Sequence, residues 1–74
     1  MKHFVMGVPK GEDFPSFEKQ IPISTTELKL IMGWEKDEDL LHDYRLTEQQ
    51  IISIEKACSL DLPKDLELFL TSYD

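Results

Sequence analysis

The chain has 74 residues, which suits one small domain, and its 15 acidic residues against eight basic ones give a formal net charge of −7. Apolar residues make up 41% of the chain and recur at regular spacings, so these features exclude a disordered polypeptide. The negative charge disfavours nucleic acid and anionic membranes as partners and favours basic surfaces.

The first third of the chain predicts a β-hairpin. In residues 2–8, apolar side chains recur at every second position on one face of a strand, as at Phe4, Met6 and Val8. Proline and glycine then interrupt the pattern, and period two returns in residues 16–23. We therefore expect residues 2–8 to pair with residues 16–23 across a long loop.

A first helix is expected at residues 25–32. Ser24 and Glu27 have the spacing of a capping box, in which each side chain accepts a hydrogen bond from the other residue's backbone amide. Leu28 opens an apolar stripe of helical period, and Gly33 stands where such a helix would end.

A second helix is expected at residues 48–59, because Thr47 and Gln50 form another capping box ahead of an apolar stripe. Between these two helices, Asp37 or Asp39 could cap a brief helical turn, with these apolar members: Leu40, Leu41 and Tyr44.

A third helix is expected from Pro63 onward, because proline is favoured in the first turn and Asp61 stands just ahead of it. Its buried stripe would consist of Leu62, Leu66, Phe69, Leu70 and Tyr73. The predicted fold class is therefore α+β, with an N-terminal β-hairpin packed against three short helices (ββααα) in a single domain, residues 1–74.

Catalytic chemistry is not expected. His3 and His42 lie on different predicted elements, and neither has a serine or cysteine at a spacing typical of a nucleophile and its base. We expect His3 on a strand surface and His42 partly exposed on a helix. Cys58 shares an apolar helix stripe, which is typical of a buried cysteine acting as a small hydrophobic residue.

No metal or cofactor site is expected either. The two histidines and one cysteine cannot make a structural zinc set. A calcium loop of EF-hand type starting at Asp37 would have Glu48 at its twelfth position. It would, however, have Leu41 in place of an oxygen ligand and His42 in place of the turn glycine.

The sequence predicts a cytoplasmic protein. A single cysteine, Cys58, leaves no intramolecular disulfide, which fits a reducing compartment. No apolar run after a basic start suggests a secretory signal, and no run approaches the roughly 20 apolar residues that span a bilayer.

The acidic residues are distributed unevenly. Charges cancel over residues 1–34, whereas residues 35–74 hold eleven acids against four bases, which is the whole net charge. The acids are densest in residues 35–39, and aromatic rings stand on both sides of this cluster. Protein interfaces are enriched in such rings, with charges around them that steer encounter. The candidate partner-binding residues are Trp34, Glu35, Asp37, Glu38, Asp39, Asp43 and Tyr44.

Two interpretations of this segment remain open. It is either an interface or a solvated loop that keeps a small protein in solution, and charge runs are often the latter. For Trp34, burial in the core competes equally with contact to a partner.

About two-thirds of the chain resembles a group of short bacterial proteins of undefined function, some encoded beside toxin modules. It is also similar, more loosely, to the immunity proteins of contact-dependent growth inhibition systems. The residues that carry the resemblance are Pro22, Leu28, Ile31, Trp34, Asp37, Glu38, the run Tyr44-Arg45-Leu46-Thr47, Gln50, Ile54, Phe69 and Leu70. The resemblance implies a cytosolic inhibitor that covers the active site of a cognate toxin, often a nuclease.

The leading hypothesis is thus a non-enzymatic immunity protein whose acidic surface meets a basic toxin. One alternative is a nucleic-acid mimic, whose acidic stripe would continue along Glu48, Glu55 and Asp61. Another is an adaptor subunit that adds an exposed hairpin edge, residues 2–8 or 16–23, to another sheet. The sequence leaves the oligomeric state open.

Overall fold

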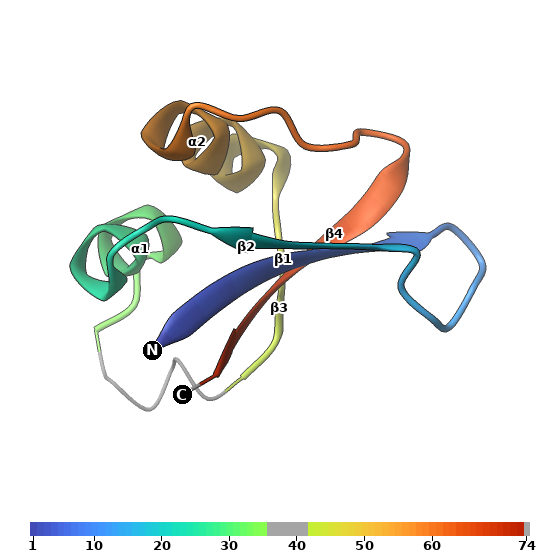
Figure 1. The fold of residues 1–74 in the computed structure, drawn as a ribbon, viewed down its shortest axis with the longest axis horizontal. Coiled ribbons are helices and arrows are strands. Elements are labelled where there is room, and N and C mark those ends of the chain that lie inside the picture. Colours follow the sequence, from blue (N-terminus) through green and yellow to red (C-terminus); the bar gives the residue numbers. More distant parts are fainter. Residues whose placement is uncertain (36–41, 74) are drawn as a thin grey trace.

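The computed structural model describes residues 1–35 and 42–73. Its elements, in chain order, are β1 (Lys2–Pro9), β2 (Phe17–Ile21), α1 (Thr25–Met32), β3 (Tyr44–Arg45), α2 (Glu48–Cys58) and β4 (Leu66–Tyr73). The strands form one antiparallel sheet in the order β2-β1-β4-β3, and both helices lie on the same face of it (Figure 1). The two ends of the chain lie side by side, because Lys2 pairs with Tyr73.

The expected hairpin is present, and its first strand is central to the sheet. β1 pairs with β2 from His3–Ile21 to Gly7–Phe17, and it pairs with β4 along its whole length. Gly7 points toward the helices, where a Cβ atom would lie 2.6 Å from the Leu66 Cδ1 atom. Glycine at this position therefore lets β4 begin with a leucine packed close to β1.

The first two predicted helices are confirmed; the expected capping box is complete at α2, whereas at α1 the structure shows its Ser24 half. The Ser24 hydroxyl accepts a hydrogen bond from the Glu27 amide, and Gly33 ends α1 in the left-handed conformation at φ 72°. Thr47 and Gln50 make the reciprocal capping box that starts α2. Among the described residues, no helix is long and apolar enough to cross a bilayer.

The predicted third helix is wrong, and with it the ββααα arrangement. Residues 66–73 form the strand β4, so the fold is α+β with a four-stranded antiparallel sheet and, over the described ranges, two helices. The segment is apolar at most positions, so it satisfies both the helical and the strand period. Pairing with all eight residues of β1 decides between them.

The brief turn predicted near Asp37 or Asp39 falls mostly outside the described residues. Its last expected member, Tyr44, belongs to the strand β3 and pairs with Leu70.

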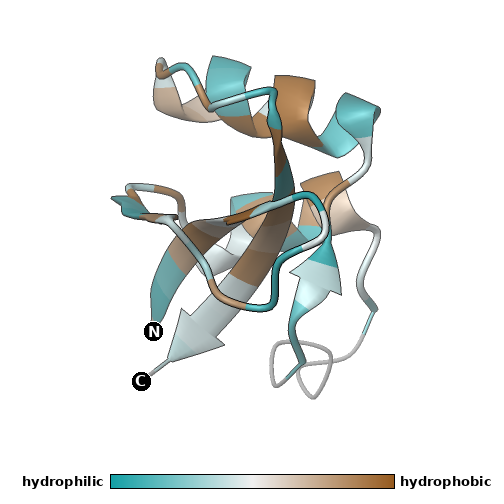
Figure 2. Ribbon diagram, turned by 90° about the vertical axis from the view of Figure 1, so that its right-hand side faces the viewer, coloured by the Kyte–Doolittle hydropathy of each residue, from teal (hydrophilic) through white to brown (hydrophobic). Residues whose placement is uncertain are grey.

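The core lies between the helices and the sheet (Figure 2). The helices contribute one fully buried residue each, Leu28 from α1 and Ile54 from α2, and the sheet contributes alternate residues of its two central strands. The buried apolar residues are Val5, Ile21, Ile23, Leu28, Leu46, Ile54, Leu62, Leu68 and Leu70.

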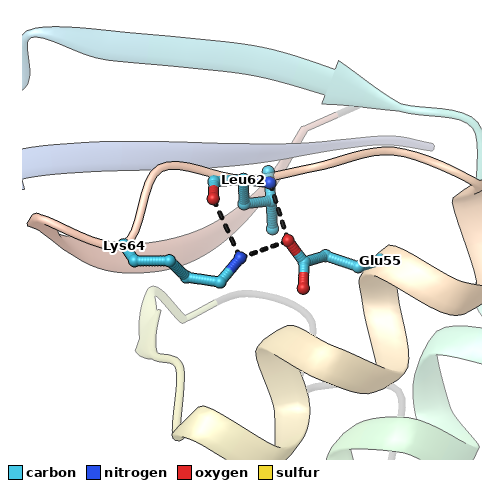
Figure 3. Close-up of polar contacts among 3 residues, drawn as sticks. All are labelled: Glu55, Leu62 and Lys64. Atoms are coloured by element: carbon cyan, nitrogen blue, oxygen red, sulfur yellow. Dashed lines mark hydrogen bonds and ion pairs between the residues drawn. The ribbon is translucent and has the colours of Figure 1, made fainter.

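A small polar cluster fixes the connection between α2 and β4 (Figure 3). The Glu55 carboxylate on α2 accepts a hydrogen bond from the Leu62 backbone amide at 2.8 Å and an ion-paired hydrogen bond from the Lys64 ammonium group. The same ammonium group donates to the Leu62 carbonyl at 2.9 Å. These bonds hold Leu62 in the core in a segment that has no repeating secondary structure.

Candidate functional site

The two ends of the acidic segment meet through aromatic rings. The ring centroids of Trp34 and Tyr44 lie 4.9 Å apart at an interplanar angle of 45°, although ten positions separate the residues in the chain. His42 packs edge-on against Tyr44, with its ring centroid 6.3 Å away at 88°. Tilted and edge-on contacts of this kind are favourable geometries for aromatic pairs.

Local structure places each ring. The left-handed turn at Gly33 redirects the chain after α1, and the Trp34 amide donates to the Lys29 carbonyl at 3.1 Å. Tyr44 is the first residue of β3 and pairs with Leu70 in the middle of β4. Trp34 is half-buried and packs against the core, so its burial is confirmed in part, and its contact with a partner stays a prediction.

The acidic side chains that flank this ring pair are exposed. Glu35 follows Trp34, Asp43 precedes Tyr44, and both carboxylates face solvent. The ion pairs within residues 1–35 and 42–73 are Arg45–Glu67 and Lys64–Glu55, so Glu35 and Asp43 take part in neither. The other predicted partner-binding acids lie outside the described residues: Asp37, Glu38 and Asp39.

His3 is buried, whereas the sequence predicted that it lies on a strand surface. Its side chain is 1% exposed, its Nδ1 atom lies 2.7 Å from the Ser72 hydroxyl, and its Nε2 atom lies 3.0 Å from the Thr25 hydroxyl. Burial, with a smaller contribution from the positive charge of the N-terminus, holds the pKa of His3 below its ordinary value. This histidine ties β4 to the start of α1 and has a structural role.

The signal for that burial was present in the sequence. His3 lies two positions before Val5 in the same strand, and every second residue of a strand faces the same way. The prediction of a surface position for His3 is therefore wrong.

The remaining predicted residues are also located. His42 is exposed in a bend rather than on a helix. Cys58 is half-buried and packs against the core, as a small hydrophobic residue would. Burial, followed by the nearby negative charge of Glu27, raises the pKa of the Cys58 thiol, which disfavours the reactive thiolate.

A groove of about 540 Å³ lies between α2 and the β3–β4 edge of the sheet. Its walls hold three cations, Lys10, Arg45 and Lys64, against two acids, Glu48 and Glu67. This charge balance does not suit the binding of a basic surface.

Metal ligands do not converge in the part of the chain that the structure describes. There, no three side chains of histidine, cysteine, aspartate or glutamate come together in an arrangement that could hold a metal ion.

Comparisons of this chain with protein-family models, with curated proteins and with solved structures found no match.

Proposed function

We propose that this chain is a non-enzymatic immunity protein that binds and neutralises a cognate basic toxin, with a nuclease domain as the favoured class. It acts in the cytoplasm by covering the cationic cleft that such an enzyme needs to hold its phosphate-rich substrate. The binding surface is the ring pair of Trp34 and Tyr44 with the acids beside it, Glu35 and Asp43, together with the acids between them in the chain: Asp37, Glu38 and Asp39.

The observation that supports this proposal is the contact between the two rings. Because Trp34 and Tyr44 lie 4.9 Å apart, Glu35 and Asp43 project from one place on the molecule. A partly exposed tryptophan and tyrosine supply the anchoring area typical of interface centres. Exposed carboxylates around them would attract a basic surface from a distance and raise the rate of association.

The nucleic-acid mimic is less well supported. It requires free carboxylates along Glu48, Glu55 and Asp61, but the Glu55 carboxylate is bound by Leu62 and Lys64 within the protein. The hydrogen bond from Lys64, with a smaller contribution from that of the Leu62 amide, also lowers the pKa of Glu55. The charged carboxylate is therefore stabilised in this internal cluster.

The structure limits which strand an adaptor of the predicted kind could use, but it does not support the adaptor alternative itself. Residues 2–8 cannot offer a free edge, because β1 is paired on both sides, whereas β2 has a single neighbouring strand in the sheet. An adaptor of this kind would therefore use residues 17–21.

The test begins with capture of a partner from lysate of the producing organism at low salt, with the wild-type chain as bait. The captured protein is then expressed in a sensitive host with and without this chain. We expect a toxic domain with a basic cleft and restored growth on co-expression. A captured partner that is harmless, or whose toxicity this chain does not relieve, would contradict the proposal.

Trp34→Ala with Asp43→Lys should abolish both capture and protection, because the substitutions remove an anchor and reverse a charge at the same place. The matched control is Phe14→Ala with Asp13→Lys, which likewise removes one aromatic ring and reverses one aspartate charge, at exposed positions of the β1–β2 loop. This control should protect as well as the wild type.

A further inference from the structure

The sheet face turned away from the helices is apolar at its centre. Val5, Leu68 and Leu70 face the helices and are buried, so their neighbours along β1 and β4 face outward. The rings of Phe4 and Tyr73 lie 5.3 Å apart on this outer face, and Tyr73 is 48% exposed. The outward residues of the two central strands that are not charged are Phe4, Met6, Val8, Phe69, Thr71 and Tyr73.

This pattern is the reverse of what a solvated sheet face shows. An antiparallel sheet with helices on one side normally carries polar residues on the other side. Here the largest apolar side chains of β1, Phe4, Met6 and Val8, point away from the core and are half-buried, and Thr71 on β4 is 4% exposed. Contiguous apolar patches of this kind on small proteins are typical of interaction surfaces.

The two edges of this outer face carry opposite charges. Met6 is paired with Glu18 on one side and Phe69 on the other, and Phe69 is paired with Arg45. A single row across the sheet therefore reads acid, apolar, apolar, base: Glu18, Met6, Phe69, Arg45. Glu18 is exposed on the β2 edge, and the Arg45 side chain is 66% exposed on the β3 edge.

We propose that this outer face binds a second copy of the chain, related by a two-fold axis parallel to the strands. Such a rotation reverses the order of the strands, so Glu18 of each copy faces Arg45 of the other. The two charge contacts are equivalent by symmetry, as an isologous interface requires. The apolar residues of β1 and β4 then meet in the middle, as in two sheets packed face to face.

The charge balance of this face suits a second copy of the same chain. The charged strand residues on it are Lys2, Glu18, Arg45 and Glu67, which sum to zero in a chain that carries −7 overall. Two such acidic molecules repel each other where their acids meet, and this neutral face avoids that repulsion.

The area of the face indicates how strongly two copies would associate. Strand spacings make the eight-residue central strands about 26 Å long and the four strands about 15 Å wide, so each copy covers about 400 Å² in projection. The total of about 800 Å² is below the roughly 1,200–2,000 Å² of stable specific interfaces and in the range of weak, transient ones, which predicts a weak, reversible dimer.

Sedimentation equilibrium between about 5 μM and 1 mM tests the proposal. We expect wild type to dimerise, and Glu18→Arg and Arg45→Glu each to weaken self-association at least about tenfold, because each places like charges at both contacts. An equimolar mixture of the two variants should dimerise again, because each arginine now faces a glutamate on the other variant.

Asp61→Arg and Lys56→Glu make the same charge changes at exposed positions away from this face, so each should dimerise as the wild type does. Far-ultraviolet circular dichroism verifies that all variants are folded. A wild type that is monomeric at about 1 mM would overturn the proposal. So would variants that self-associate like the wild type, or a mixture that does not associate.

Discussion

At His3, the imidazole bridges two hydroxyl groups, one on β4 and one in the first turn of α1. The protonated ring is disfavoured there, so the pKa of His3 is lower in the folded chain than the value near 6.5 in the unfolded chain. When the pH falls below that value, the unfolded state takes up the proton first, and stability falls until the folded-state pKa is also passed. We expect the urea midpoint of unfolding to drop between pH 7 and pH 5.

His3→Gln keeps polar atoms that can bond both hydroxyls but cannot take up a proton, so it should flatten this part of the pH profile. His42→Gln is the control, because it makes the same substitution at an exposed histidine. An equal slope in wild type and His3→Gln would show that another group causes the pH dependence.

Ser59 ends α2 in the left-handed conformation, at φ 52°, where residues with a Cβ atom are strained. Glycine is the residue favoured at this position, so Ser59→Gly should stabilise the protein by about 1 kcal/mol. For a chain of this size, that corresponds to a rise in Tm of about 4–8 °C in a thermal melt. Thr47→Gly, which removes the cap at the other end of the helix, should have the opposite sign.

At the scale of elements, the connection from α2 to β4 depends on the cluster of Glu55, Leu62 and Lys64. Glu55→Ala removes the acceptor of the Leu62 amide, so this amide should exchange its hydrogen faster, as NMR hydrogen exchange would measure. Glu67→Ala breaks the exposed ion pair with Arg45 and should leave the Leu62 amide protected. Equal exchange at Leu62 in all three proteins would exclude a role for this cluster.

The elements differ in how far the sequence could predict them. The caps of α1 and α2 are hydrogen bonds between residues three or four positions apart in the chain. The helix ends could therefore be predicted directly from Ser24, Gly33 and Thr47. β4 could not, because its conformation depends on β1 at the other end of the chain. Asp61 and Pro63 have the sequence pattern of a helix start, but they lie in the connection between α2 and β4, which Glu55 stabilises.

The same distinction applies to the candidate site. Composition alone drew attention to Trp34 and Tyr44 beside the acids. Their contact at 4.9 Å follows from the end of α1 and the pairing of β3 with β4, which no local pattern in the sequence encodes.

At the scale of the whole molecule, the described surface divides by chemistry. The ring pair of Trp34 and Tyr44 carries exposed acids, whereas the outer sheet face is apolar and its charged strand residues are balanced. The two proposals accordingly assign the two surfaces to different partners, a basic toxin at the ring pair and a second copy at the outer face.

The most direct test of the central claim is the rate at which this chain associates with its captured toxin, measured by stopped-flow fluorescence at low and high salt. Screening should slow wild type steeply, because the Debye length falls from about 30 Å at 0.01 M salt to about 8 Å at 0.15 M. Glu35→Lys with Asp43→Lys should remove most of that salt dependence, whereas Glu12→Lys with Asp13→Lys, an equal change of charge on the β1–β2 loop, should keep it. Equal salt dependence in wild type and both variants would contradict the assignment of the binding surface to the acids beside Trp34 and Tyr44.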